Sequence, residues 1–212
     1  MKKILLLVFA TIVFWGCAVS PEKKASSIIE NAIKNSLYHP ESYDPIGTKI
    51  DSAFAPFDLP DFYEKTLKLS QIGAEIEDLD RDLRFAKSSM AIWNDRSTAF
   101  AKNEYNEAKN KYEKCSSQIE ALHLKAEKLS EEMKAIIEQG RHFIGWKATH
   151  SYRAKNNAGQ TLIGETVFIL DAEMTRVLAG YDSESVEYQT VQKIYEMLKD
   201  AADRNNQYIQ TN

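Results

Sequence analysis

Residues 69–93, LSQIGAEIEDLDRDLRFAKSSMAIW, carry apolar side chains at alternating steps of three and four residues. A second series with the same spacing runs from Ala101 to Ile136. Sustained heptads without proline are typical of coiled-coil helices. The heptad positions are Leu69, Ile72, Ile76, Leu79, Leu83, Ala86, Met90 and Trp93 in the first series, and Ala101, Tyr105, Ala108, Tyr112, Cys115, Ile119, Leu122, Ala126, Leu129, Met133 and Ile136 in the second.

The heptad phase breaks at the polar run Asn94–Thr98, which favours a turn. One unbroken helix through residues 62–139 would separate the flanking segments by roughly 110 Å. If those segments belong to one sheet, the chain must reverse at this break. We therefore predict an antiparallel hairpin in which Asp82 lies near Lys111 and attracts it, whereas Lys68 and Lys125 repel each other. Exchange of the hairpin between two protomers would use the same heptads and give a homodimer.

The flanking segments change from helical spacing to strand alternation. A short amphipathic helix is indicated by Ile29, Ile33 and Leu37. The segment 41–55 then alternates as a strand, and Pro45 favours either an edge position or a late beginning of this strand. After the hairpin, strands are predicted at 144–154, at 162–170, apolar on both faces towards its end and therefore central, and at 176–181. A final helix presents the stripe Tyr188, Val191, Tyr195, Leu198 and Ala202, which can pack on the sheet.

These elements predict an α+β fold. A small antiparallel sheet of about four strands is covered by two short helices, and the long coiled-coil helical hairpin is inserted between strands one and two. The predicted divisions are a signal peptide at 1–16, a lipidated tether at 17–27, an α/β body at 28–61 and 140–212, and the hairpin at 62–139.

The N-terminus reads as a secretory signal. Lys2 and Lys3 precede an apolar run from Ile4 to Trp15, too short to span a bilayer, and Gly16-Cys17 follows. Gly16-Cys17 resembles the lipobox of bacterial lipoproteins, which implies lipid on Cys17; the alternative is a plain secretory signal. More than one acyl chain on Cys17 would anchor the protein stably to a membrane. No acidic cluster follows Cys17, so we expect an outer membrane, facing the periplasm.

Two further segments resemble a known group of proteins. Leu37 to Pro45 reads Leu-Tyr-His-Pro-Glu-Ser-Tyr-Asp-Pro, and His150 to Gly159 reads His-Ser-Tyr-Arg-Ala-Lys-Asn-Asn-Ala-Gly, with Phe168 and Asp171 downstream. Together they resemble segments of uncharacterised envelope lipoproteins of Bacteroides-like bacteria. This resemblance implies an envelope lipoprotein and carries no catalytic residues to this chain.

Composition and motifs argue against several activities. A net charge of −4 with dispersed basic residues gives no electrostatic footprint for nucleic acid. The sequence contains no nucleophile, phosphate-loop or dinucleotide motif, and its four histidines have no metal-ligand spacing. We therefore expect no enzyme, no catalytic residues, no metal and no cofactor. Cys115, at a heptad position, reads as a small buried hydrophobe.

Candidate interaction residues fall in two places. Met90 and Trp93 lie at the predicted hairpin turn, where Trp93 is either a cap that packs over the turn or an exposed contact anchor. Arg153, Lys155 and Asn156 lie at the end of a predicted strand, where they form either a β-turn or a small polar binding spot.

The sequence thus predicts a lipid-anchored, non-catalytic envelope protein whose hairpin contacts an unknown protein partner or gives structural support. Two alternatives stay open. One is a transport-adaptor-like subunit, since some adaptors insert a helical hairpin into a β domain. The other is a periplasmic small-molecule-binding protein or enzyme that uses the strand face around Trp146, His150, Tyr152 and Arg153.

Overall fold

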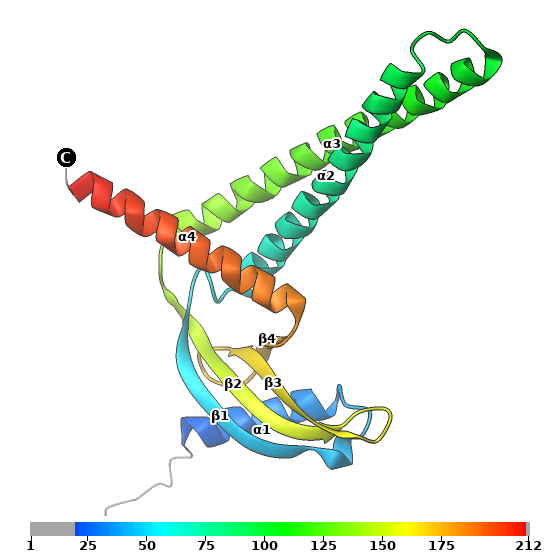
Figure 1. The fold of residues 1–212 in the computed structure, drawn as a ribbon. Coiled ribbons are helices and arrows are strands. Elements are labelled where there is room, and N and C mark those ends of the chain that lie inside the picture. The colour runs from blue at the N-terminus through cyan, green and yellow to red at the C-terminus, as the bar shows by residue number, and fades with distance from the viewer. Residues whose placement is uncertain (1–19, 211–212) are drawn as a thin grey trace, which may run out of the picture.

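The structure is a computed structural model that describes residues 20–210, so Cys17 and the signal sequence lie outside the described residues. Within this range the chain is α+β, with one four-stranded antiparallel sheet and four α-helices (Figure 1). The elements are α1 (Pro21–Lys34), the short 3₁₀ helix η1 (Pro40–Ser42), β1 (Asp44–Phe54), α2 (Pro60–Ile92), α3 (Ala99–Glu138), β2 (Phe143–Lys155), β3 (Thr161–Leu170), β4 (Val177–Asp182) and α4 (Val186–Gln210).

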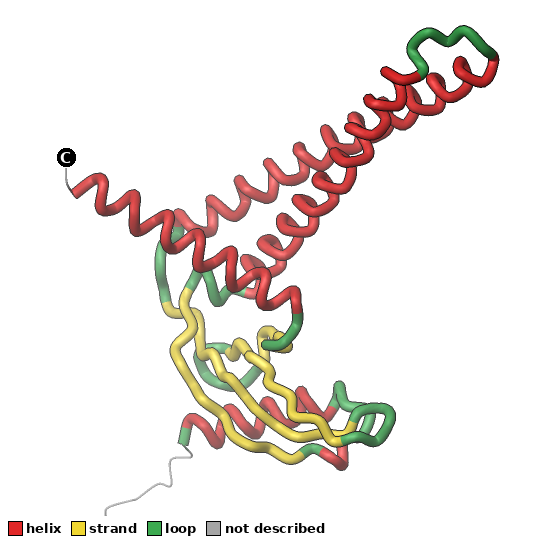
Figure 2. Tube along the Cα trace, in the orientation of Figure 1, coloured by secondary structure: helices red, strands yellow, loops and turns green. Residues whose placement is uncertain are grey.

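The strands follow one another across the sheet in chain order, β1-β2-β3-β4, and each pairs antiparallel with the next. The predictions that the first strand lies at an edge of the sheet and that the third lies in its interior are confirmed. β1 is an edge strand, as Pro45 indicated, because proline cannot donate a ladder hydrogen bond. β3 lies between β2 and β4, as its apolar residues on both faces indicated. Figure 2 shows the strands grouped between α1 and the longer helices.

Helix α1 covers one face of the sheet. Ala25, Ile29 and Ile33 recur every four residues, are buried, and pack with Ala148, Phe168 and Leu170 of the sheet. The helix starts earlier than the sequence analysis predicted, so residues 21–27, assigned there to the tether, are helical. The signals are local. Ser20 caps the helix by accepting a hydrogen bond from the Lys23 N–H, and Pro21 stands at the start.

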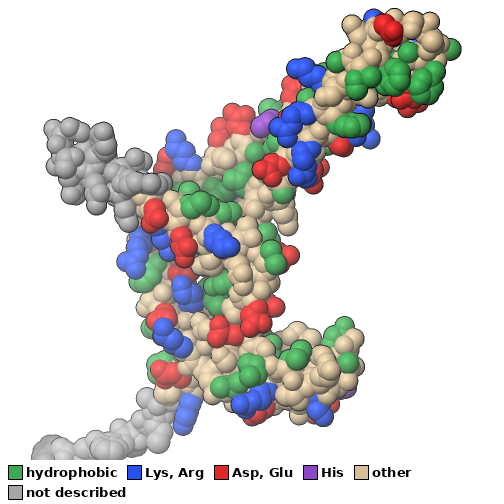
Figure 3. Space-filling view, in the orientation of Figure 1, with side chains coloured by type: hydrophobic (Ala, Val, Ile, Leu, Met, Phe, Trp, Pro, Cys, Tyr) green, Lys and Arg blue, Asp and Glu red, His purple; other side chains and the backbone are tan. Residues whose placement is uncertain are grey.

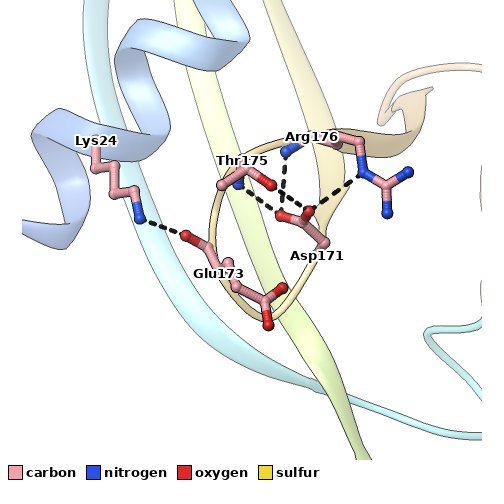
Figure 4. A network of polar contacts seen from close by, with 5 residues as sticks. All are labelled: Lys24, Asp171, Glu173, Thr175 and Arg176. Atoms are coloured by element: carbon pink, nitrogen blue, oxygen red, sulfur yellow. Dashed lines mark hydrogen bonds and ion pairs between the residues drawn. The ribbon is translucent and has the colours of Figure 1, made fainter.

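The turn between β3 and β4 is organised by Asp171 (Figure 4). Its carboxylate accepts hydrogen bonds from the Thr175 hydroxyl and N–H, both at 2.6 Å, and from the Arg176 N–H at 3.1 Å. These donors, the Thr175 hydroxyl above all, hold the pKa of Asp171 well below its usual range. Lys24 of α1 donates to the Glu173 carbonyl in the same turn, which ties the start of α1 to the sheet.

The long helical insert between β1 and β2 forms an arm, residues 60–138. Helices α2 and α3 lie side by side, and the chain reverses at residues 93–98, at the predicted phase break (Figure 1). Two ion pairs join the helices: Lys111 to Asp82 at 3.0 Å, as predicted, and Lys65 to Glu132 at 3.2 Å. Cys115 is a free, buried cysteine in the arm.

Helix α4 crosses the base of the arm (Figure 1). Val191 and Tyr195 of α4 pack with Phe62, Tyr63 and Met133 in a cluster that we call the junction core. The apolar stripe of this helix was predicted to pack on the sheet, whereas its most buried residues meet the ends of α2 and α3. An amphipathic stripe shows that a helix buries one face but does not name the element that covers it.

Candidate interaction surfaces

The first candidate surface is the arm tip, residues 90–100, which contains the predicted residues Met90 and Trp93. Trp93 is half-buried at the end of α2, and its ring packs edge-to-face on Phe100, with the ring centroids 5.5 Å apart. Met90 is also half-buried. Trp93 therefore caps the turn, and it shares this apolar contact with a residue on the other helix.

Ile92 and Phe100 are the large apolar side chains that the arm tip exposes most, at 71% and 61%. Figure 3 shows hydrophobic side chains gathered at this end of the arm. The sequence analysis missed both residues because they lie outside the heptad series. A usable signal was present, since Phe85 and Ile92 are one heptad apart and out of phase with the buried stripe. Phe85 is exposed as well.

Polar contacts give the turn a defined shape. Asp95 accepts hydrogen bonds from the Ser97 N–H and hydroxyl, and the Thr98 hydroxyl caps α3 by accepting from the Ala101 N–H. Arg96, at a φ of 50°, places its guanidinium over the Tyr105 ring at 4.3 Å. The apolar side chains of the tip thus stand on an ordered turn.

The predicted polar spot at Arg153, Lys155 and Asn156 does not form as one site. Arg153 pairs with Asp44 at 3.1 Å, and the Lys155 N–H donates to the Ser42 hydroxyl at 2.8 Å. The Asn156 side-chain oxygen accepts from the N–H groups of Ala158 and Gln160, so Asn156 builds the β2–β3 turn. The β-turn interpretation describes Asn156 correctly.

A second candidate surface lies beside this turn, and we call it the hairpin groove. It is an open groove of about 350 Å³ between the loop after α1, the β2–β3 hairpin and the end of β4. It brings together Lys155 and Asn156 with apolar residues that the sequence analysis did not connect with them. Its lining is Ser36, Leu37, Tyr38, Tyr152, Ala154, Lys155, Asn156, Leu162, Ile163, Gly164, Glu165, Thr166, Asp182 and Glu184.

The strand face around His150 is filled. His150 is fully buried, and its ring nitrogens lie 2.8 Å from the Tyr43 hydroxyl and 2.8 Å from the Thr48 hydroxyl. Burial lowers the pKa of His150. The Trp146 ring N–H donates to the Ala172 carbonyl at 2.9 Å. The polar groups of His150 and Trp146 therefore form hydrogen bonds inside the body. Tyr152, on the same strand face, lines the hairpin groove.

A cleft of about 410 Å³ opens between α2 and α3 near the base of the arm. It is lined by Lys65, Lys68, Lys125 and Lys128, together with three carboxylates and Leu129. Lys68 and Lys125, the pair predicted to repel, both line this cleft.

Within residues 20–210, no group of three or more His, Cys, Asp or Glu side chains is placed to hold a metal ion. In the same range, no helix is both long enough and apolar enough to cross a membrane. Comparison with protein families, with curated proteins and with solved structures finds no match to this chain. We describe the chain by its architecture, a small α+β body with a long helical insert between β1 and β2.

Proposed function

We propose that this chain is a lipid-anchored, non-catalytic protein of the bacterial envelope whose arm binds a protein partner through its tip. The observation that carries the proposal is the exposed apolar pair Ile92 and Phe100 at the end of the arm. Helix α2, with 33 residues, extends about 50 Å. Large apolar side chains presented this far from the body, on an ordered turn, are typical of a contact surface for another protein.

We further propose that α2 and α3 form an antiparallel coiled coil. Ala101, Ala108, Cys115 and Leu122 recur every seven residues on α3 and are buried. Ile72 and Ala86 on α2 are buried at the same repeat. Small side chains at these positions let two helices approach closely, and a coiled coil is stiff enough to hold the tip away from the body.

In this arrangement the sheet has a helix on each side. Helix α1 packs on one face through Ile29, and α4 reaches the other side through Tyr188, whose ring stacks with Tyr181 of β4 and with Tyr63. The sheet lies between α1 and the arm (Figure 1). Lipid on Cys17, a few residues before α1, would therefore hold the α1 side of the body near a membrane and leave the arm pointing away from it.

The anchor is tested by replacing Cys17 with serine. We expect the wild-type chain to incorporate an alkyne analogue of palmitate and to sediment with membranes, because acyl chains on Cys17 supply the binding energy. The Cys17→Ser variant should lose the label and become soluble, and Cys115→Ser, the matched control, should keep both properties. Equal labelling of wild type and Cys17→Ser would contradict the lipid anchor.

The tip is tested with a double variant, Ile92→Ser with Phe100→Ser. A photo-crosslinking amino acid placed at Arg96 should capture a partner in intact cells, and the double variant should reduce that product at least tenfold. Loss of two central apolar contacts has an effect of this size at an interface. Helix content should stay close to wild type, since both side chains are exposed, and the lost Trp93–Phe100 contact should lower the free energy of unfolding by no more than about 1.5 kcal/mol.

The matched control is Leu124→Ser, which removes an exposed apolar side chain from α3 far from the tip. It should leave the crosslinked product unchanged. Two results would count against the tip as the contact surface: a product that survives the double variant, or one that Leu124→Ser removes equally.

A further inference from the structure

The β3 strand is longer than its partner β4. All ten residues of β3 pair with β2, from Thr161↔Lys155 to Leu170↔Trp146. β4 pairs with β3 only as far as Asp182, which lies opposite Thr166. After Asp182 the chain leaves the sheet and starts α4 at Val186. Among the residues that the structure describes, no strand therefore covers the outer edge of β3 at residues 161–164.

The hydrogen-bond phase shows which backbone groups face this open edge. The Asn156 N–H donates to the Gln160 carbonyl across the β2–β3 turn, so bonded pairs with β2 recur at every second residue, at Leu162 and Gly164. The Glu165 carbonyl accepts from the Ser183 N–H on the β4 side. It follows that the N–H and C=O groups of Thr161 and Ile163 point outward from the sheet.

The open edge lacks the features that usually prevent strand addition. Natural edge strands carry proline, lysine or bulges. The other edge strand, β1, has all three, with Pro45, Lys49 and two register shifts. Residues 161–165 of β3, Thr-Leu-Ile-Gly-Glu, have none of them. On the side of the sheet opposite β1, β4 is the outer strand, and beyond its end residues 161–164 of β3 form a stretch of edge without these protective features.

The same edge borders the hairpin groove, which supplies apolar contacts. Ile163 is 65% exposed and Leu162 is 55% exposed, and Tyr38 lines the groove from the loop after α1. The Tyr152 ring lies against Gly164, where an added Cβ would meet it at 3.0 Å. An added strand would thus find both free backbone groups and apolar side chains on its two faces.

Charge distinguishes the two ends of the groove. Glu165, Asp182 and Glu184 gather at the β4 end of the groove, and none of them has an ion-pair partner among the described residues. Lys155 lies at the opposite end, beside the turn. A strand that continues the line of β4, antiparallel to β3, would begin at the acidic end and finish near Lys155.

We propose that the open edge of β3 binds an extended peptide segment of another protein by antiparallel strand addition. The segment carries a basic residue at its N-terminal end, near Glu165, Asp182 and Glu184, and apolar residues opposite Ile163 and Leu162. Backbone hydrogen bonds to the free edge supply affinity, while the groove and the acidic end supply specificity. This surface is distinct from the arm tip, so the two can be tested independently.

The probe is the peptide Lys-Val-Val-Thr-Thr-amide with a free amino terminus, in which the lysine lies opposite Gly164 and the first valine opposite Ile163. It is titrated into the purified full chain and followed by amide hydrogen exchange. In the free chain the amides of Thr161 and Ile163 should exchange fast, and those of Leu162 and Gly164 slowly. Added peptide should protect Ile163 at least tenfold. Slow exchange of Ile163 in the free chain would overturn the proposal.

Backbone methylation of the peptide separates strand addition from simple apolar binding. N-methylation of the first valine, opposite Ile163, should abolish binding because it removes an N–H that points at β3. N-methylation of the second valine, opposite Leu162, should leave binding intact because that N–H points away. Equal effects of the two modifications would refute pairing in this register.

On the protein side, Ile163→Pro removes the outward N–H while leaving the bonds of Leu162 and Gly164 to β2. It should weaken peptide binding at least tenfold, and Ile163→Thr, which keeps the N–H, should bind within a few-fold of wild type. Binding that Ile163→Pro leaves unchanged would overturn the proposal. So would a wild-type dimer that Ile163→Pro dissociates, since the occupant would then be a second copy of the chain.

Discussion

Replacing Phe62 with alanine is expected to lower the free energy of unfolding by about 3–5 kcal/mol, the usual cost of removing a buried aromatic ring. Phe62 is fully buried in the junction core. Its ring centroid lies 5.8 Å from that of Phe57 and 5.6 Å from that of Tyr195. The change therefore leaves a cavity at the point where the base of the arm, α4 and the body meet.

Urea denaturation followed by circular dichroism measures this loss. The matched control is Phe85→Ala on the same helix, whose ring is exposed and whose removal should change the unfolding free energy by no more than about 0.5 kcal/mol. If Phe62→Ala cost less than about 1 kcal/mol, the junction core would not be the packed connection described above.

The second expected result is a loss of stability in acid that depends on His150. Its ring is fully buried between the hydroxyls of Tyr43 and Thr48. Burial lowers the pKa of His150 below its ordinary value of 6.5, and the charge of Glu30 opposes this only in part. Tyr43 stays protonated throughout, since burial raises its pKa to about 12.

The direction follows from proton binding. Below pH 6.5 the unfolded chain binds a proton at His150 that the folded chain does not, so the unfolding free energy decreases as the pH falls. The slope from one group is at most about 1.4 kcal/mol per pH unit. Well above pH 6.5 the group is neutral in both states and contributes no slope.

His150→Gln tests this assignment, because an amide can donate and accept hydrogen bonds but does not titrate in this range. The slope of unfolding free energy against pH between 6.5 and 5 should become smaller in this variant. His142→Gln is the control, because His142 is exposed and its ring meets water in both states. A slope that survives His150→Gln would assign the acid sensitivity to another group.

The arm shows how far periodicity carries a prediction. Spacing alone placed the reversal at Asn94–Thr98 and put Asp82 beside Lys111, and both predictions are confirmed. The spacing did not distinguish buried heptad positions, such as Ala108 and Cys115, from half-buried ones, such as Tyr105 and Tyr112. Two paired helices cover only one side of each other, so part of every heptad stripe stays at the surface.

The candidate surfaces were less accessible from the sequence. Trp93 was singled out at the tip, but the exposed side chains are chiefly Ile92 and Phe100, because Trp93 turns onto Phe100. Lys155 and Asn156 were grouped with Arg153, which instead pairs with Asp44. Arg153 and Lys155 alternate onto the same face of β2, but Arg153 lies directly opposite Asp44 of β1, which pairs with it. A shared strand face therefore does not make a common site.

The order and type of the main elements could be predicted from the sequence, because each period of apolar residues is a local property of the chain. Heptads predicted the arm, alternation predicted the strands, and Pro45 predicted an edge. What covers each face, and where a strand has no neighbouring strand, became clear only from the three-dimensional packing. β4 ends at Asp182, α4 turns to the base of the arm, and Ile163 is left at an open edge. These outcomes depend on contacts between residues far apart in the chain, which no local pattern records.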